Sequence, residues 1–443
     1  MGNLTTPPSV QKLQSALHAK AKAEPGYRFY LLYDKVYRAD VLEYAYRSCQ
    51  ANKGAAGVDG QRFEDIEAYG QSRWLGELAN RLRGKTYEPK AVKRVWIPKP
   101  NSDKMRPLGI PTITDRVVQT AALLVLDPIF DADLAPEQYA YRSDRGAHDA
   151  VQAVHRLLNT GHTQVVDADL SGYFDSIAHA ELMRCVARRV VDRHILGLIK
   201  AWLVAPVEDD DGKGGTTRSR ANRDNKRGTP QGAPISPLLS NLYMRRFVLG
   251  WSRLGYRQRW SAEIVNYADD FVICCKHGAR DAMDAMREIM QRLKLTVNED
   301  KTHLCQIPRE RFDFLGYTFG RCYSRKDGHA YIGTRPSQKS IKRMVANISE
   351  VTDRRTGWLD AQAIVGRLNR KLTGWANYFC LGPVSPAYQL VDTHARQRLR
   401  RWLCKKHQIA GTGTSRFPDQ YLYGELGLVR LAPRTHNLPW AKA

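Results

Sequence analysis

The sequence predicts an α+β fold, in which a long region with small antiparallel sheets is followed by an all-α module. Two patterns carry this prediction. Over residues 41–330, apolar residues at helical spacing alternate with short β-rich runs, whereas after residue 335 only helical spacing remains. We therefore expect an N-terminal extension (1–40), a mixed region (41–330), a helical domain (335–410) and a basic C-terminal tail (411–443).

The composition indicates a folded protein with a polyanionic partner. Of the 443 residues, 43% are hydrophobic, which is enough to bury a sizeable core. The 69 Lys and Arg outnumber the 45 Asp and Glu and give a net charge of +24, which is most simply matched to phosphates. No apolar run reaches the ~18–20 residues of a membrane helix, and the N-terminus has no apolar signal core, so we expect a soluble intracellular protein without a membrane partner.

The eight cysteines are scattered and form no Cys-x-x-Cys pair. This spacing argues against a zinc module or a disulfide framework, and we expect buried, reduced thiols.

Three segments are readable from their local pattern. Residues 92–97 and 107–110 read as two strands joined by a turn, which predicts a β-hairpin rimmed with basic side chains. Residues 208–227 form a long hydrophilic stretch, which predicts a mobile surface loop. Residues 1–40 are polar and interrupted by Pro and Gly, and so read as an extension.

Apolar stripes predict three helices in the C-terminal quarter. Two of them cover 341–351 and 364–379. The third is predicted over 388–405, with Leu390, Leu399 and Trp402 inward. Residues 331–443 hold 19 basic and 6 acidic residues, a net charge of +13. Six cations on and just after the third helix are expected to point largely outward: Arg396, Arg398, Arg400, Arg401, Lys405 and Lys406.

An acidic pair interrupts an apolar segment. Asp269 and Asp270 lie between the apolar runs 264–267 and 271–275. As a β-hairpin, this segment would bury both strands and project the two carboxylates from its tip. Adjacent ionised carboxylates repel each other, so a fold keeps them together most readily when a divalent cation compensates.

A second acidic segment lies upstream. Residues 165–170 read as an apolar strand containing Asp167 and Asp169, followed by Gly172 and two aromatic residues at a strand-to-helix turn. A third carboxylate from this strand end would complete a platform for two Mg²⁺ ions about 3.5–4 Å apart, which suits nucleotidyl transfer. Taken singly, Asp167, Asp169 and Asp175 are explained as well by helix caps or surface acids.

A third segment, 227–235, is dense in Gly and Pro. Such a loop lets the backbone approach a ligand closely, and Gln231 within it can pair with a polar edge. Pro237, followed by apolar residues at helical spacing, predicts the start of a helix. On its own, the loop is equally consistent with an ordinary tight turn.

These three segments, in this order, resemble the motifs of group II intron-encoded reverse transcriptase/maturases. The resemblance covers nearly the whole chain. It implies a right-hand polymerase, with fingers and palm over 41–330 and a thumb/maturase X domain over 335–410. Further polymerase blocks are similar at 52–60, 97–112, 139–150, 298–302 and 314–317, and 368–379 is close to the maturase signature.

Residue by residue, the resemblance implies that Asp169, Asp269 and Asp270 hold two Mg²⁺ ions and catalyse the reaction. Phe174 looks like the aromatic gate that excludes a 2′-hydroxyl, and Gln231 sits where the family contacts the nucleotide. Lys99 and Arg106 match the fingertip cations that meet the dNTP triphosphate, although simple backbone or RNA contacts stay open for these two. The six cations of the third helix would bind RNA through its phosphates and shape.

The resemblance also implies partners: an RNA template with a DNA primer, dNTPs, the group II intron RNA and target DNA, in the cytoplasm of a bacterium. Beyond residue 410 there are no paired cysteines and no HNH-like cluster, so we expect the endonuclease domain of many relatives to be missing. Segment 141–146 lacks the proline common after its first arginine. Two other functions stay open: a free-standing relative used in DNA repair or phage defence, and an RNA-binding splicing factor without polymerase activity.

Overall fold

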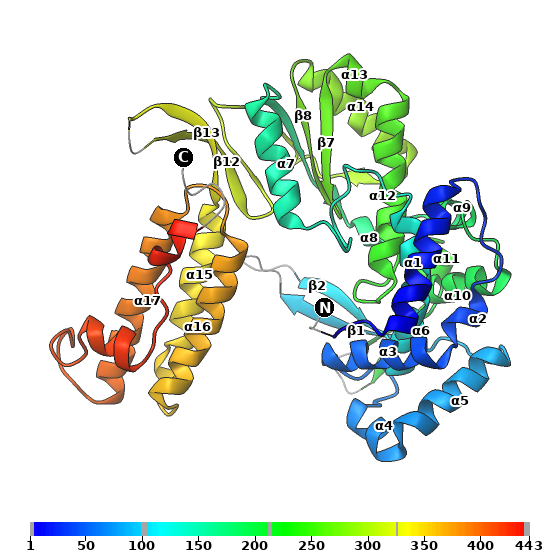
Figure 1. The fold of residues 1–443 in the computed structure, drawn as a ribbon, viewed down its shortest axis with the longest axis horizontal. Coiled ribbons are helices and arrows are strands. Elements are labelled where there is room, and N and C mark those ends of the chain that lie inside the picture. The colour runs from blue at the N-terminus through cyan, green and yellow to red at the C-terminus, as the bar shows by residue number, and fades with distance from the viewer. Residues whose placement is uncertain (1–3, 99–104, 211–214, 325–326, 438–443) are drawn as a thin grey trace.

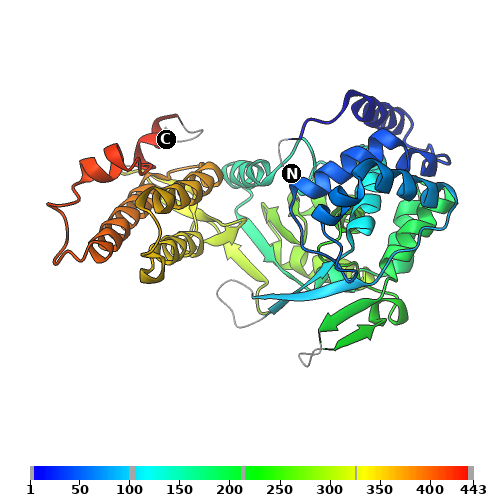
Figure 2. The ribbon, with the colours of Figure 1, turned by 90° about the horizontal axis from the view of Figure 1, so that it is seen from below.

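The computed structural model describes residues 4–98, 105–210, 215–324 and 327–437. Figure 1 shows a helical N-terminal part, a central group of strands and three long C-terminal helices set apart on the other side. In the view of Figure 2, the N-terminal and the C-terminal helices lie at opposite ends of the long axis. The predicted order, a mixed region followed by an all-α domain, is confirmed. None of the described helices is both long and apolar enough to cross a membrane.

The N-terminal residues belong to the main core. α1 (Pro8–Ala23) packs on α6 (Ile113–Asp131) and buries Val10, Leu17 and Ala21, which lie on one face of the helix. This segment is therefore part of the core rather than an extension, because its polar composition hides a narrow apolar stripe. The neighbouring helices are α2 (Tyr33–Val36), α3 (Ala39–Ala51), α4 (Phe63–Tyr69) and α5 (Gln71–Arg83).

A four-stranded sheet contains the predicted basic hairpin. β1 (Val92–Pro98) and β2 (Met105–Ile110) pair antiparallel, which confirms both expected strands. The sheet order is β2-β1-β5-β6, with β5 (Val207–Asp210) parallel to β1 and antiparallel to β6 (Thr216–Ser219).

The segment 208–227 is not simply a loop. It contributes most of β5, all of β6 and the short helix α11 (Ala221–Asp224). All four residues of β6 are exposed, so the strand has no alternation of apolar and polar side chains for sequence reasoning to detect.

The central sheet holds the acidic segments. Its order is β10-β3-β8-β7, and all neighbours are antiparallel. The predicted hairpin is formed by β7 (Ala262–Tyr267) and β8 (Asp270–Cys275), and the predicted upstream strand is β3 (Gln164–Ala168). Other elements around the sheet are β4 (Leu170–Ser171), α8 (Tyr173–Ser176), α9 (His179–Ala187), α10 (Arg193–Leu203), α13 (Tyr256–Arg259), β9 (Thr296–Val297) and β10 (His303–Gln306).

Both faces of this sheet are buried. Val166 belongs to the main core, together with α12 (Ser236–Arg253) and α14 (Ala279–Arg292). Its neighbour Val165 points to the opposite face and packs in a second cluster with α7 (Ala147–Asn159). Strands that are buried on both faces read as continuous apolar runs, which is the pattern that the sequence shows here.

The C-terminal domain has a core of its own. A small sheet leads into it, and its three helices confirm the apolar stripes. The sheet consists of β11 (Phe312–Phe314), β12 (Tyr317–Tyr323) and β13 (Ala330–Pro336). The helices are α15 (Gln338–Val351), α16 (Ala361–Tyr378) and α17 (Ser385–Lys406), with the short turns η1 (Arg354–Thr356), η2 (Tyr421–Glu425) and η3 (Ala432–Asn437).

Two features of this domain differ from the prediction. Leu390 is 49% exposed, because it lies nine residues, or two and a half turns, from the buried Leu399. The residues after α17 are not a free tail, since Phe417, Leu422 and Leu431 are buried in the core of the three helices. That packing makes the described part of 411–437 a structural part of the domain.

Candidate active site

Three aspartates meet at one end of the central sheet. Asp270 begins β8, Asp269 lies in the turn before it, and Asp169 directly follows β3. β3 pairs with β8 so that Ala168 lies opposite Phe271, and one step further along this register Asp169 comes opposite Asp270. The structure therefore brings together the three carboxylates that the sequence predicts as catalytic.

The electrostatics of these carboxylates reflect their proximity. Partial desolvation, followed by the charges of Asp269 and Asp169, raises the pKa of Asp270 to about 6. Desolvation also raises the pKa of Asp269, with Asp169 adding to the effect. Arg106 opposes both shifts, which places this cation of β2 near the carboxylates. Like charges that are partly withdrawn from water are unfavourable by themselves and are stabilised by a bound cation.

The loop after β9 fixes the position of Asp169. The side-chain amide of Asn298 donates to Asp169 Oδ2 at 3.0 Å, and Lys301 Nζ lies 3.2 Å from the same oxygen. The backbone N–H of Asn298 donates to the Asp169 carbonyl at 2.8 Å, and Thr302 Oγ1 accepts from the Asp169 N–H at 3.4 Å. Asp169 is therefore held in place through its backbone and one carboxylate oxygen.

The turn that carries Asp269 is held from behind by Asn266. Ala268 adopts φ 59°, a conformation that a residue with a Cβ rarely takes and that needs support from its surroundings. Asn266 is fully buried, and its amide nitrogen donates to the Ala268 carbonyl at 2.8 Å and to the Asp270 carbonyl at 3.4 Å. Sequence reasoning gave Asn266 no role, although a polar residue inside an otherwise apolar strand was a signal for one.

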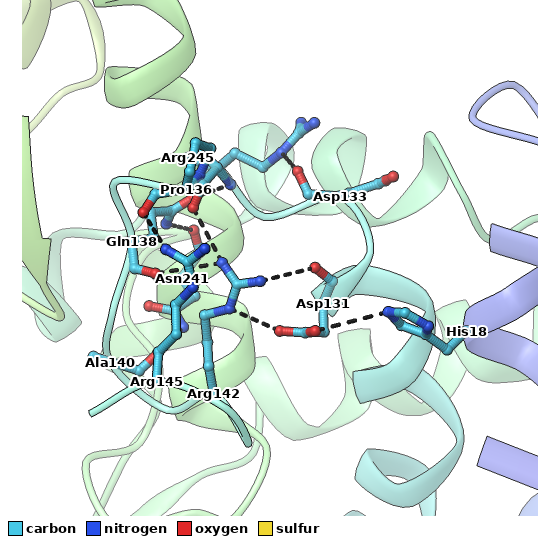
Figure 3. Close-up of polar contacts among 11 residues, drawn as sticks. His18, Asp131, Asp133, Pro136, Gln138, Ala140, Arg142, Arg145, Asn241 and Arg245 are labelled. Carbon is cyan, nitrogen blue, oxygen red and sulfur yellow. Dashed lines mark hydrogen bonds and ion pairs between the residues drawn. The ribbon is translucent and has the colours of Figure 1, made fainter. Parts of the chain in front are cut away.

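A second network fixes the segment that pairs with Asn266. Arg142 donates to Asp131 Oδ1 at 2.8 Å and to the carbonyl of Ala135 at 3.1 Å (Figure 3). Gln138, in the same picture, donates to the Asn241 carbonyl of α12 at 3.0 Å. The backbone of Asn266 pairs with Glu137 and Tyr139 on either side of Gln138. Arg142 thus anchors this loop even though the proline expected after it is absent.

The glycine-rich loop lies against β2. The N–H of Gly109 donates to the Gln231 carbonyl at 2.6 Å. Gly232 has φ 108°, and a Cβ there would come 2.6 Å from the Gly109 carbonyl oxygen, so only glycine fits this approach. The side-chain amide of Gln231 is half-buried and has no hydrogen bond to any other residue in the described part of the chain. It is therefore free to contact a substrate.

The remaining predicted nucleotide contacts have different outcomes. Phe174 lies on α8, packs edge-on against Tyr173 with ring centroids 5.5 Å apart, and accepts at its carbonyl from the Thr229 N–H at 2.8 Å. This bond ties α8 to the glycine-rich loop, so Phe174 and Gln231 belong to one unit. Arg106 is exposed on β2 near the carboxylates. Lys99 lies outside the described residues.

A cavity of about 530 Å³ lies beside the carboxylates, between the central sheet and β11. This volume is in the range of ligand pockets, ~300–1,000 Å³. Burial, followed by the charges of Asp270, Asp313 and Asp169, raises the pKa of the lining residue Asp167 to about 7. The sequence did not predict that Arg311, Asp313 and Lys339 line this cavity, because they are distant in sequence and lie there only through the packing of β11 and α15. The charged lining residues are Asp167, Asp169, Asp270, Lys301, Arg311, Asp313 and Lys339.

The six cations predicted to bind RNA fall into two groups. Arg396 and Arg400 both bind Asp419, at 2.8 and 2.5 Å, and Arg400 also donates to the Phe417 carbonyl. Arg398 and Lys406 donate to backbone carbonyls at the end of α15 and in the turn that follows. These four hold the domain together. Arg401 and Lys405 are exposed and have no partner among the residues that the structure describes.

Other cations of the domain face outward without partners. A cavity of about 540 Å³ between the end of α15 and α16 is lined on the α16 side by Arg367, Arg370 and Lys371, and on the other side by residues that include Glu350 and Asp353. All three cations are exposed, and none forms an ion pair within the described ranges. Their spacing along α16 was the signal for a basic face, and sequence reasoning passed over it in favour of α17.

Comparisons with known proteins match both parts of the chain. Residues 97–319 match the family described as reverse transcriptase (RNA-dependent DNA polymerase), and residues 341–417 match the group II intron, maturase-specific domain. The chain is 31% identical over 369 residues to protein YkfC of Escherichia coli, which covers 75% of this chain and 93% of that protein.

Two further relatives are intron proteins. The chain is 32% identical over 224 residues to the group II intron-encoded protein LtrA of Lactococcus lactis, which covers 50% of this chain and 35% of LtrA. It is 31% identical over 109 residues to the mitochondrial nuclear intron maturase 2 of Arabidopsis thaliana, which covers 24% of this chain and 15% of that protein. The matched segments thus span about a third of LtrA and less of the plant protein.

Proposed function

The chain belongs to the reverse transcriptase family of RNA-dependent DNA polymerases and carries a group II intron maturase-specific domain, and on that premise we propose how its residues act. Asp169, Asp269 and Asp270 hold two Mg²⁺ ions and catalyse transfer of a deoxynucleotide to the 3′-hydroxyl of a DNA primer. The observation that carries this proposal is the strand register that sets Asp169 opposite Asp270, at the tip of the hairpin that bears Asp269.

The donor set suits magnesium. Among the residues that the structure describes, no group of three or more His, Cys, Asp or Glu side chains is arranged so that it could hold a metal ion by itself. Mg²⁺ is usually bound by one or two carboxylates together with waters and substrate phosphates, so a site of this kind needs no all-protein cage. When bound, the ions would activate the primer hydroxyl and offset the charge on the departing pyrophosphate.

The residues around the carboxylates would orient the substrate. Asn298 and Lys301 hold Asp169 at a fixed angle, and Arg106, with Lys99, neutralises the triphosphate of the incoming dNTP. Phe174 lies under the sugar and excludes a 2′-hydroxyl, while the unpaired amide of Gln231 contacts the nucleotide. The bond between the Phe174 carbonyl and the Thr229 N–H supports these roles, because it holds α8 against the loop that carries Gln231.

The proteins of this family that carry a maturase domain bind intron RNA and use a template and a primer. We propose that this chain promotes splicing of its own group II intron and inserts that intron into target DNA. The thumb/maturase domain would supply the RNA contacts, through Arg401, Lys405 and the basic face of α16. The relatives in Escherichia coli and Lactococcus lactis support action in the bacterial cytoplasm.

Replacement of one carboxylate tests the proposal. In Asp269→Ala, we expect Mg²⁺-dependent extension of a DNA primer on an RNA template to fall by about a thousandfold or more, because a ligand to the reacting centre is lost. RNA affinity should stay within about twofold, since the site contributes little to phosphate binding. Asp281→Ala, which removes an exposed carboxylate in the first turn of α14, is the matched control.

A variant Asp269→Ala that still extends the primer would contradict the assignment. The same variant in a splicing assay separates the two roles, because a splicing function independent of polymerisation should survive the substitution. A wild-type protein that splices but extends no primer would leave only the splicing-factor function.

A further inference from the structure

A pocket lined by four arginines lies on a face of α12 that is turned away from the central sheet. Its volume is about 270 Å³, and α12 contributes Arg245, Arg246 and Arg253 to it, while Arg188 comes from the end of α9. Arg246 and Arg253 are two turns apart and lie on one face of the helix. The helix packs on the sheet with a different face, where Phe247 meets Phe271 at a ring-centroid distance of 5.0 Å. The pocket is thus separated from the catalytic carboxylates by α12 itself.

The positive charge in this pocket is only partly balanced by the described protein. The hydrogen bond from Lys294, and more weakly the charge of Arg246, lowers the pKa of Glu181, so that carboxylate already has a partner. The one acidic residue that lines the pocket is Asp133, whose carboxylate already lies 3.3 Å from Arg189. Arg245 donates to the backbone carbonyl of Asp133 at 2.6 Å (Figure 3). Within the ranges described, Arg188, Arg246 and Arg253 form no ion pair. Burial lowers the pKa of Arg245, the Asp133 charge opposes this shift, and the like charges of Arg188 and Arg253 add to it, so these guanidinium groups lie close enough to repel one another.

Arg246 shows that an acceptor is missing. Its side chain lies over the Tyr243 ring, 5.3 Å from the centroid, and its Nη1 is buried without any hydrogen-bond acceptor in the described structure. A buried donor on a charged group is costly when it has no partner, so such groups in folded proteins nearly always have one. A ligand with anionic oxygens would supply it.

The shape of the pocket is consistent with a ligand next to the helix backbone. Gly250 lines the pocket within α12, and a Cβ at this position would meet no atom within 4 Å. No neighbour in the described protein therefore requires glycine, although glycine weakens a helix relative to alanine. The missing side chain leaves open space between Arg246 and Arg253.

We propose that this pocket binds a phosphate group of RNA that is held outside the polymerase site. A guanidinium group can donate two parallel hydrogen bonds to the oxygens of one phosphate. The pocket volume of about 270 Å³ is small and suits a single phosphate group. This inference rests on the proposed function, because a folded intron RNA is the polyanion large enough to reach both the thumb and the back of the palm.

Inorganic phosphate is the first probe. Phosphate at constant ionic strength should raise the thermal unfolding temperature of the full-length protein, and Arg188→Gln combined with Arg253→Gln should remove most of that rise. Both arginines are exposed, so the double variant is expected to fold, and Arg246→Gln provides an independent test of the buried group. Equal stabilisation of the wild type and both variants by phosphate would overturn the proposal.

Binding of a long, structured RNA is the second measurement. In the double variant, we expect RNA affinity at moderate salt to fall about tenfold and the slope of log affinity against log salt to decrease by about one to two, as for the loss of that many phosphate contacts. The control is Arg184→Gln with Arg280→Gln, which removes the same charge from exposed positions outside the pocket. An unchanged slope in the pocket variant, or the same change in the control, would overturn the assignment to RNA and leave an acidic protein as the occupant.

Primer extension on a short template–primer separates this inference from the proposed function. Such a duplex occupies only the polymerase site, so the pocket variant should extend it at the wild-type rate. A loss of long-RNA binding together with normal extension supports the pocket. An inactive wild type whose pocket still binds phosphate and RNA would contradict the proposed polymerase function and leave the pocket intact.

Discussion

The carboxylates of the palm and the cations of α17 are both dense clusters of charge, yet the protein treats them in opposite ways. In the palm, Asp269 and Asp270 stand beside Asp169, and their pKa values rise because they are desolvated near like charges. On α17, Arg396 and Arg400 share Asp419, and their neighbours are bound to backbone carbonyls. In the described structure, Asp269 and Asp270 have no ion pair and only Asp169 is paired, with Lys301, whereas four of the six α17 cations are bound within the fold.

The two clusters differ in whether their charged groups have partners within the protein. Charge density alone selected α17 as the RNA-binding helix, but the structure assigns much of that charge to holding the C-terminal segment in place. Charge without an internal partner is the better indicator of a functional site, because such a group remains available to a ligand, whereas a paired group must first give up its internal contact. By that criterion, Arg401, Lys405 and the basic face of α16 are the stronger candidates for RNA contacts.

The largest effect expected from this comparison comes from Asn266, which supports the turn that carries Asp269. In Asn266→Ala, the catalytic turn loses the donor that holds the Ala268 carbonyl, so we expect kcat for primer extension to fall by about 10- to 100-fold. The KM for dNTP should stay nearly constant, because the nucleotide contacts lie on other elements. Steady-state kinetics at a temperature where the variant is folded provides the measurement.

Stability distinguishes this positioning role from a general structural one. Loss of the buried hydrogen bonds should cost about 1–3 kcal/mol of unfolding free energy. Asn266 Oδ1 has no donor in the described structure, so this residue satisfies only part of its hydrogen-bonding capacity, which argues against stability as its main purpose. A variant that lost stability but kept kcat would show that the turn holds its shape without Asn266.

The next effect compares paired and unpaired cations of α17. Arg400→Gln removes the ion pair of a largely buried arginine with the half-exposed Asp419 and a bond to the Phe417 carbonyl, so we expect a loss of about 1–3 kcal/mol in unfolding free energy with little change in RNA affinity. Arg401→Gln with Lys405→Gln should change stability by less than about 0.5 kcal/mol, yet weaken RNA binding several-fold and reduce its salt slope. Denaturant unfolding and anisotropy titrations at several salt concentrations measure the two quantities.

The opposite outcome would break the comparison. If Arg400→Gln weakened RNA binding without a loss of stability, the internal contacts of α17 would be incidental and charge density would be the correct guide. Arg416→Gln is a suitable control, because this exposed arginine near Phe417 has no ion pair in the part of the chain that the structure describes.

Sequence alone was enough for the features that depend on local pattern. The hairpin at 264–275 and the helix after Pro237 follow from spacing and turn chemistry over a few residues. The pairing of Arg400 with Asp419 cannot be predicted in this way, because the two residues meet only through tertiary packing. The same holds for Lys339, which α15 places beside the carboxylates. The exposed strand β6 was missed for a different reason, since a strand without a buried face has no periodic signal.

The last prediction tests the effect of an unpaired buried carboxylate, Asp127, which lies outside the candidate active site. Asp127 lies within α6, one turn before Asp131, and burial raises its pKa to about 7, with the Asp131 charge adding to the shift and Arg142 opposing it. The described structure gives Asp127 no ion pair, whereas Asp131 binds Arg142 at 2.8 Å. Asp127 is therefore an uncompensated carboxyl like those of the palm, but without a substrate to stabilise it.

The direction of its pH dependence follows from the raised pKa. Between about pH 4 and pH 7, the unfolded chain releases the Asp127 proton while the folded chain keeps it, so this residue lowers stability as the pH rises and the effect levels off above about 7. Asp127→Asn removes that dependence and should therefore stabilise the protein at pH 8, but hardly at pH 4. Asp131→Asn should destabilise it at pH 8, because that carboxylate is paired. If both substitutions changed the unfolding free energy at pH 8 in the same direction, the presence of an ion-pair partner would not explain which buried carboxylates destabilise this fold.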